Sequence, residues 1–446
     1  MFVFEKALAY ALKYNSQAEI FCEKREDTHI KFRNNALDFV GAKHLDGISL
    51  RIIRNNKLGF SSATYAEPLR ETSPEHVHII RRLVKNAIAT SKFGHIAHFS
   101  FPSKIRGTSV RILDNHLAEA DEKECIAIGE QTIDSIKRFN NKVKSSIEIQ
   151  KMNNTVYIAN SNDTSYSYSK TVMSIEITSS INLKGNIIEI HDSWSSCSKI
   201  DHEKLVKSIC YELEMLTSLK TQKIDSMLTS TIFMPKATYA LLYPLRMSIN
   251  GKFAHKGLSR WTGKIGKKVS SNKIWIFDDG TLDSAPGSAP IDDEGVCTQK
   301  TSIVMQGVLK NFIYDLQSAG EAETQPTGNG LREFLTPPSP STTNLVIPSG
   351  KISSADIIES LDTGILISQT LGVGQASTSS GLFLVDIGLG FKIENGKIVS
   401  RVKNAVVNGN IFDSLNNISS LSKETEYKYG AWIPSLCFSK MAVKAK

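Results

Sequence analysis

One pair of residues in the sequence has the types found on a metallopeptidase helix. His202 and Glu203 open the stretch "DHEKLVKSICYELEML" at residues 201–216. His-Glu begins the HExxH motif, in which two histidines one helical turn apart bind zinc and the glutamate is the general base. The positions four and five residues after His202 hold Val206 and Lys207, and neither side chain can bind zinc as an imidazole does. We therefore interpret the pair as the solvated first turn of a helix, where a carboxylate interacts favourably with the helix dipole.

The other histidines do not complete a metal site. His76 and His78 are two positions apart at the start of a predicted helix, so their rings point in different directions. His95 and His98 have no cysteine or carboxylate pattern beside them. From residue 223 onward the only histidine is His255, so that half of the chain cannot build a two-histidine zinc site by itself.

Two acidic stretches are the remaining candidates for chemistry. "DDG" occupies residues 278–280 and "DDEG" occupies residues 292–295. Carboxylates at this spacing can bind a hard cation, but Asp-Gly sequences are also ordinary turn formers. We favour turns, and we keep the alternative of a peptidase with an unfamiliar site built on Asp292, Asp293 and Glu294. The sequence has neither a GxSxG nucleophile motif nor a phosphate-binding P-loop.

Composition narrows the class of protein. The 446 residues are 41% hydrophobic and 22% charged, as in globular proteins, and the formal net charge of +8 is spread along the chain without a Lys/Arg block. Nucleic acid is therefore not the expected partner. The six cysteines form no CxxC pair and predict reduced thiols. Without a signal-peptide pattern or a run of about 18 apolar residues, we expect a cytoplasmic protein that does not enter a membrane.

The first half of the chain combines long helical and strand patterns. Apolar residues recur at helical spacing in four segments, the last of which has Asp201 as its expected N-cap: residues 2–15, 74–92, 117–139 and 201–219. Alternating segments between them are separated by turn-forming pairs, which predict antiparallel hairpins: Asn34-Asn35, Asn55-Asn56, Asn153-Asn154 and Asn162-Asp163.

The second half has a different pattern, with short apolar runs separated by Gly, Ser and Thr. "IENGKI" at residues 393–398 is a strong hairpin signal, because Asn-Gly tolerates the positive φ angles of a type I′ turn. We therefore expect an α+β fold of two domains. Residues 1–222 form a mixed α/β domain with an antiparallel sheet and long helices, and residues 223–446 form a β-rich domain.

Segments along nearly the whole chain resemble, in the same order, the TldD/PmbA family, also known as modulators of DNA gyrase. The resemblance is carried by "IKFRNNALDFVGAKHLDGISLRIIRNNKLGFSSATY" in the first half. In the second half it is carried by "FDDGTLDSAPGSAPIDDEGVCTQKTSIVMQGVLKNFIYD", "PTGNG" and "GVGQASTSSGLFLVDIGLGFKIENGKIVSRVKNAVVNGNIFDSL". Each segment alone is weak, but their joint occurrence is specific.

The resemblance implies a particular kind of subunit. TldD-type subunits of this family carry HExxxH on a helix of the C-terminal domain and a later cysteine ligand, whereas PmbA-type, or TldE-type, subunits lack these ligands and pair with the TldD type. The family's lead-in to the zinc helix corresponds to "MPKATYALLYPLRMSINGK", so Tyr243 and Ser248 replace the two histidines and Pro244 replaces the glutamate. Proline there is expected to disturb the helix. The later ligand falls near "SKETEYKYG", which has no cysteine, and Cys437 is expected in the core.

The resemblance thus predicts a subunit without catalytic or metal-binding residues of its own. Zinc would be held by a TldD-type partner in a heterodimer, or the chain would pair with itself. The expected ligand is an unfolded or leader peptide held as an added strand. The glycine-containing loops Gly328-Asn329-Gly330 and Gly374-Gln375 are candidates for the peptide groove. The alternative is a regulatory protein that binds gyrase, which the basic character permits.

Overall fold

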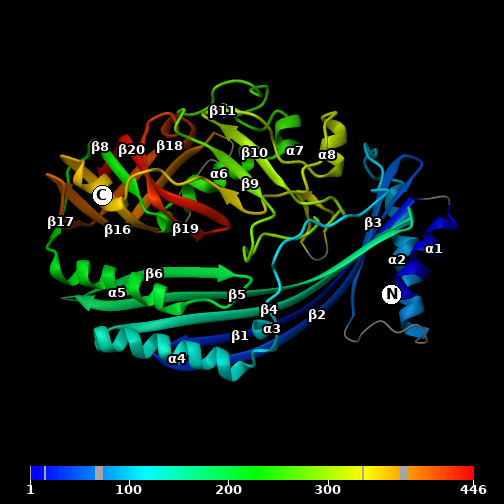
Figure 1. Cartoon of the computed structure of the whole chain (residues 1–446), viewed down its shortest axis with the longest axis horizontal. Helices are drawn as coiled ribbons and strands as arrows, with labels where there is room; N and C mark the ends of the chain where they lie inside the picture. Colours follow the sequence, from blue (N-terminus) through cyan, green and yellow to red (C-terminus); the bar gives the residue numbers. More distant parts are fainter. Residues whose placement is uncertain (1, 15–16, 66–73, 184, 334–335, 372–379) are drawn as a thin grey trace.

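Two large β-sheets, one small two-stranded sheet and their associated helices make up the described part of the fold (Figure 1). The structure is a computed structural model and describes residues 2–14, 17–65, 74–183, 185–333, 336–371 and 380–446. Within these ranges the expected α+β class is confirmed: an antiparallel sheet with long helices comes first, and a β-rich part follows.

The first sheet is antiparallel and has six described strands in the order β3-β2-β1-β4-β5-β6. β1 lies in the middle and pairs along most of its length with β2 on one side and β4 on the other. The Asn-Asn turns form as predicted, with positive φ at Asn34, Asn35, Asn55 and Asn56. The strands are β1 (Gln17–Arg33), β2 (Ala36–Arg54), β3 (Lys57–Tyr65), β4 (Lys144–Asn160), β5 (Thr164–Leu183) and β6 (Asn186–Ser196).

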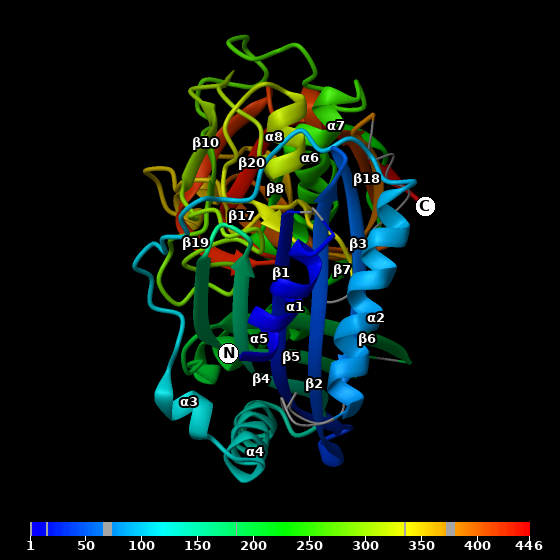
Figure 2. The ribbon, with the colours of Figure 1, turned by 90° about the vertical axis from the view of Figure 1, so that its right-hand side faces the viewer.

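Helices cover the two ends of this sheet. α1 (Phe2–Leu12) and α2 (Pro74–Ser91) pack at one end, and Figure 2 shows α2 running beside β2 and β3. α4 (Glu122–Phe139) and α5 (His202–Ser218) pack at the other end over a core of β4, β5 and β6 side chains. The amphipathic pattern of each helix therefore supplies the apolar face that the sheet buries.

Two expectations for this half are wrong. The segment 117–139 is two helices, α3 (Asn115–Glu119) and α4, because Ala120 is extended and the Asp121 side chain caps α4 by accepting from the N–H of Glu124. No turn forms at Asn153-Asn154: β4 runs straight through, and the Asn154 amide donates to Glu23 on β1 at 2.8 Å. Cross-strand bonding here overrides the local turn preference.

The second sheet has twelve described strands, and five of them close into a barrel. β20 pairs with β8, β8 with β15, β15 with β16, β16 with β18, and β18 with β20 again, so this set leaves no free edge. The strands are β7 (Thr221–Gln222), β8 (Met227–Phe233), β9 (Ile276–Asp279), β10 (Lys300–Met305), β11 (Val308–Leu309), β14 (Leu345–Val346), β15 (Thr363–Leu371), β16 (Leu382–Glu394), β17 (Lys397–Val402), β18 (Ala405–Asn410), β19 (Ile418–Lys428) and β20 (Ala431–Ala445), with β12 (Gly330–Leu331) and β13 (Ser339–Pro340) pairing separately.

Short helices fill the spaces around the barrel. They are η1 (Pro235–Ala237), α6 (Tyr239–Ile249), α7 (Gly251–His255), α8 (Leu316–Glu321), α9 (Ser354–Glu359) and α10 (Ile411–Ser414). The predicted hairpin at residues 393–398 is confirmed, with φ of 47° at Asn395 and 74° at Gly396. None of the helices in the described ranges has the length and apolar content needed to span a bilayer.

The two halves share one hydrophobic core. Ile209 and Leu213 of α5 belong to the same buried cluster as Leu366, Leu389 and Phe391 of the barrel strands. Helix α5 therefore packs against the first sheet and the barrel at once, and Figure 1 shows it between them. This contact fixes the position of the second half relative to the first.

Candidate functional site

Helix α6 lies where the family resemblance expects the zinc helix. Its buried face is formed by Leu241, Leu242, Leu245 and Ile249. Helix α6 continues through Pro244 without a break. The expectation that this proline disturbs the helix is therefore wrong, in that the helix does not end there. Proline removes one backbone hydrogen bond, and burial of the apolar face on both sides of it compensates.

The two positions expected to replace the histidines face different environments. The Tyr243 side chain is 45% exposed, whereas Ser248 is 2% exposed. Side chains five positions apart on a regular α-helix diverge by about 140°, which accounts for the difference. Neither hydroxyl is a preferred zinc ligand, and the two do not converge on one point.

The end of strand β19 meets α6. The family resemblance puts the later cysteine ligand near this end of β19. The Arg246 guanidinium donates to the Tyr429 carbonyl oxygen, and the Tyr239 and Tyr429 rings are 4.9 Å apart. The Tyr429 hydroxyl donates to the Lys236 carbonyl oxygen at 3.0 Å, and burial raises its pKa to about 12. This junction therefore presents neutral phenols and a fixed cation, and its residues do not fit a Zn²⁺ ion.

His202, His95 and His98 belong to segments other than α6 and β19. His202 and Glu203 form the first turn of α5, and the Asp201 carboxylate accepts from the N–H of Glu203 at 3.2 Å, which confirms the predicted cap. His95 and His98 are exposed. Across the described ranges, no group of three or more His, Cys, Asp and Glu side chains is arranged to hold a metal.

The two acidic stretches are internally bonded: Asp278 and Asp279 are buried at the end of strand β9, whereas Asp293 and Glu294 lie in a turn, as favoured for that stretch. Asp278 accepts from the Asn329 amide and from Thr343. Asp292 accepts from three backbone N–H groups, those of Glu294, Val296 and Gly330. These bonds fix the loops, and burial, followed by the Glu294 charge, raises the pKa of Asp292 well above its ordinary value.

Glu294 belongs to a buried ion cluster that joins the two halves of the chain. The Arg51 guanidinium donates to Glu294 at 2.5 Å and to both oxygens of Glu19 at 3.0 and 2.7 Å, and Arg332 donates to Glu19 at 2.8 Å. Burial would raise the pKa of Glu19, but the two guanidinium groups hold it below its ordinary value. Burial raises the pKa of Glu294 to about 7, and Arg51 opposes the rise while Asp315 adds to it.

A second buried cluster links α5 to the barrel. Lys236 donates to Glu212 at 2.7 Å, and Ser368 and Gln369 also donate to Glu212. Lys428 binds Asp192 of β6 at 2.5 Å. The sequence analysis missed both clusters, because their members are far apart in the chain: Arg51 and Glu294 are separated by 243 positions.

The candidate groove loop at residues 328–330 is placed beside the first ion cluster. Asn329 is 1% exposed and donates to Asp278 and to the Ser341 carbonyl oxygen. Gly330 is buried, and a Cβ atom there would lie 2.2 Å from a Glu294 carboxylate oxygen. This loop is thus held from inside the protein. The other candidates, Gly374 and Gln375, lie outside the described residues.

Comparisons with known proteins relate the chain to one family. Residues 226–445 match the PmbA/TldA metallopeptidase C-terminal domain, and residues 18–91 match the PmbA/TldA metallopeptidase domain 1. An uncharacterized protein of Methanocaldococcus jannaschii is 27% identical over 97% of this chain and 98% of its own length. A metalloprotease TldD homolog of Buchnera aphidicola is 38% identical, but the match spans 42% of this chain and 38% of that protein.

Solved structures show the same fold. The crystal structure of TldE from Thermococcus kodakarensis has a TM-score of 0.89 at 20% identity and covers 99% of this chain and 100% of the other. A Thermotoga maritima protein named for modulation of DNA gyrase has a TM-score of 0.88 at 19% identity, with 99% of each chain covered. At these identities the likeness concerns the fold alone.

Proposed function

Because the chain belongs to the PmbA/TldD metallopeptidase family, we propose that it is the non-catalytic subunit of a two-component zinc peptidase. A TldD-type partner supplies the zinc ion and the general base. This chain completes the enclosed space in which an unfolded or leader peptide is cleaved. The partner is a different subunit of the same family, and in its absence the chain pairs with itself.

The observation that supports this proposal is the chemistry of the α6 and β19 junction. By the family resemblance, Tyr243, Pro244 and Ser248 take the positions of the HExxxH residues, and Arg246 holds a positive charge on the same helix. A guanidinium disfavours a nearby dication by Coulomb repulsion. The family scaffold is kept, while the catalytic position carries groups that stabilise the structure instead.

Peptide holding is the role that we assign to this subunit. A six-stranded antiparallel sheet offers edge strands to which an extended peptide can add by backbone hydrogen bonds. The loop at residues 328–330 contributes by holding the local backbone in place, because the Asn329 side chain donates a hydrogen bond to Asp278 inside the protein. Gly374 and Gln375 are proposed to contact the peptide itself.

Reconstitution tests the proposal. The chain is purified alone, the TldD-type partner alone, and the two together, and each sample is assayed for bound zinc and for cleavage of an unfolded peptide. We expect zinc and chelator-sensitive cleavage only where the partner is present, with faster cleavage when both chains are combined. A partner whose HExxxH glutamate is changed to glutamine is the matched control and should be inactive in both settings. Chelator-sensitive cleavage by this chain alone would overturn the proposal.

A further inference from the structure

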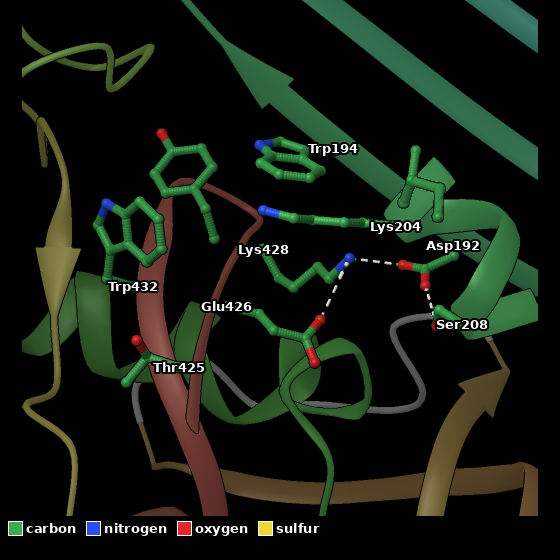
Figure 3. A pocket seen from close by; sticks show the side chains of 10 residues that line it. Asp192, Trp194, Lys204, Ser208, Thr425, Glu426, Lys428 and Trp432 are labelled. Carbon is green, nitrogen blue, oxygen red and sulfur yellow. Dashed lines mark hydrogen bonds and ion pairs between the residues drawn. The ribbon is translucent and has the colours of Figure 1, made fainter. Parts of the chain in front are cut away.

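A pocket of about 320 Å³ lies between the two halves of the chain, beside the end of β19 (Figure 3). Strand β6 and helix α5 form one wall through Trp194, Lys204 and Ser208, and the β19–β20 hairpin forms the other through Tyr427 and Trp432. The volume falls within the range of small-ligand sites in proteins.

Aromatic rings line this pocket from three different strands. Trp194 comes from β6, Tyr427 from β19 and Trp432 from β20, and all three are only partly buried. The Tyr427 and Trp432 rings are 5.5 Å apart and tilted by 58°. Flat apolar surfaces that remain open to solvent are suited to bind a planar ring by stacking.

Lys204 supplies a positive charge inside the pocket. Its ammonium lies 5.2 Å from the centroid of the Trp194 ring, and Figure 3 shows its side chain extended beneath that ring toward Trp432. None of the salt bridges or hydrogen bonds found among the described residues involves its ammonium. A cation held over an aromatic face and lacking an acidic partner is available to an incoming anion.

The other charges of the pocket are already matched. Asp192 accepts from Ser208 and Lys428, and Lys428 also lies 3.4 Å from Glu426. Burial opposes ionisation of Asp192, but Lys236 and Lys428 keep its pKa below the ordinary value. The floor is therefore a fixed set of ion pairs, and Lys204 is the lining charge without an acidic partner among the described residues.

We propose that this pocket binds an aromatic carboxylate, with the carboxylate on Lys204 and the ring between Trp194 and Trp432. The ligand is either a free small molecule or the aromatic C-terminal residue of a peptide, because both present the same groups. Since the two walls come from different halves of the chain, bound ligand bridges them. Binding is therefore also expected to raise the melting temperature.

Isothermal titration calorimetry at low salt tests the site with matched probes. The first pair is 2-naphthoate and its neutral analogue 2-naphthamide, and the second pair is N-acetyl-Gly-Phe with a free or an amidated C-terminus. We expect the carboxylate of at least one pair to bind about tenfold more tightly than its amide. Preference for the naphthoate pair identifies a small-molecule site, and preference for the peptide pair identifies a C-terminus site.

Substitution of Lys204 shows whether the assigned residue is responsible. Lys204→Met keeps the apolar stem, removes the charge and alters an exposed position, so the fold should be kept. It should weaken binding of the carboxylate by about tenfold and leave binding of the amide unchanged. Lys207→Met, at an exposed position of the same helix outside the pocket, is the control and should bind like the unaltered chain.

Three results would overturn the proposal. They are equal binding of the carboxylate and the amide in both pairs, unchanged carboxylate binding by Lys204→Met, and no saturable heat from any probe at millimolar concentration. Trp432→Leu gives an independent check, because loss of the ring should weaken the charged and neutral probes alike. Unchanged binding of both probes by that variant would also count against the site.

Discussion

Arg51 of strand β2 donates to the Glu294 carboxylate at 2.5 Å and thereby joins the first sheet to the second half of the chain. Both side chains are buried, and the Arg51 guanidinium lies 5.3 Å from the centroids of the Phe99 and Phe101 rings. Because Arg51 also binds Glu19, one cation serves two buried carboxylates. Removing it would leave Glu294 without its ion-pair partner and Glu19 with Arg332 alone.

Arg51→Met should therefore lower the free energy of unfolding by about 3–5 kcal/mol, which is typical when one member of a buried ion pair is deleted. Urea unfolding near neutral pH measures the loss. Arg33→Met is the control, because Arg33 of β1 pairs with Asp38 at an exposed site, where deletion costs less than about 1 kcal/mol. Equal losses in the two variants would show that the buried cluster is not a source of stability.

The raised pKa of Glu294 predicts a pH dependence of stability. A carboxyl whose pKa is about 7 in the folded chain, and ordinary in the unfolded chain, binds its proton more tightly when folded. Stability from this group is thus greatest at acidic pH and falls as the pH rises from about 4.5 to about 7. Glu294→Gln removes this contribution. The slope of the unfolding free energy against pH should therefore be more positive in this variant than in the unaltered chain, between about pH 4.5 and pH 7. Identical slopes in the two proteins would contradict the prediction.

Gly330→Ala should destabilise the chain by about 1–3 kcal/mol, because the new methyl group would meet the Glu294 carboxylate at 2.2 Å. Arg51 and the Leu316 N–H hold that carboxylate, so it has no room to move. Gly388→Ala is the matched control: its methyl would meet the side chain of Leu371, which is 61% exposed and can turn away. In thermal unfolding, Gly330→Ala should have a lower melting temperature than Gly388→Ala. Similar melting temperatures would contradict the predicted clash between the new methyl group and Glu294.

The sequence was sufficient to predict features that depend on local signals. The Asn-Gly turn at residues 395–396, the cap at Asp201 and the division into an α+β part and a β-rich part follow from neighbouring residues alone. The single helix expected over residues 117–139 was wrong, because periodicity does not register an extended residue such as Ala120 next to a capping aspartate. The turn expected at Asn153-Asn154 was wrong, because pairing on both sides of β4 fixes those residues as strand.

The site could be predicted only in part. The family resemblance assigns Tyr243, Pro244 and Ser248 to the motif positions and puts the later ligand near "SKETEYKYG", and these assignments stay predictions. The structure adds that Tyr429 of that segment contacts α6 through Arg246. The ion clusters and the Lys204 pocket could not be predicted, because they bring together residues from strands and loops that are remote in the chain. Nothing near Arg51 or Lys204 in the sequence distinguishes them from other basic residues.

Restoring the motif letters should not restore a zinc site. The variant Tyr243→His, Pro244→Glu, Ser248→His spells HExxxH, but the segment "SKETEYKYG" still has no cysteine to serve as the later ligand. Arg246 also keeps its positive charge on the same helix. We expect its affinity for zinc, measured by competition with a chromophoric chelator, to equal that of the unaltered chain. A further variant that adds Arg246→Ala separates the effect of the cation from that of the missing cysteine ligand: if repulsion alone excludes zinc, binding appears only in this variant. Circular dichroism confirms that each variant is folded, since the larger side chain at the buried position of Ser248 should cost about 1–3 kcal/mol. One tightly bound zinc ion per chain in the first variant would show that the three substitutions alone separate this chain from a zinc-binding subunit.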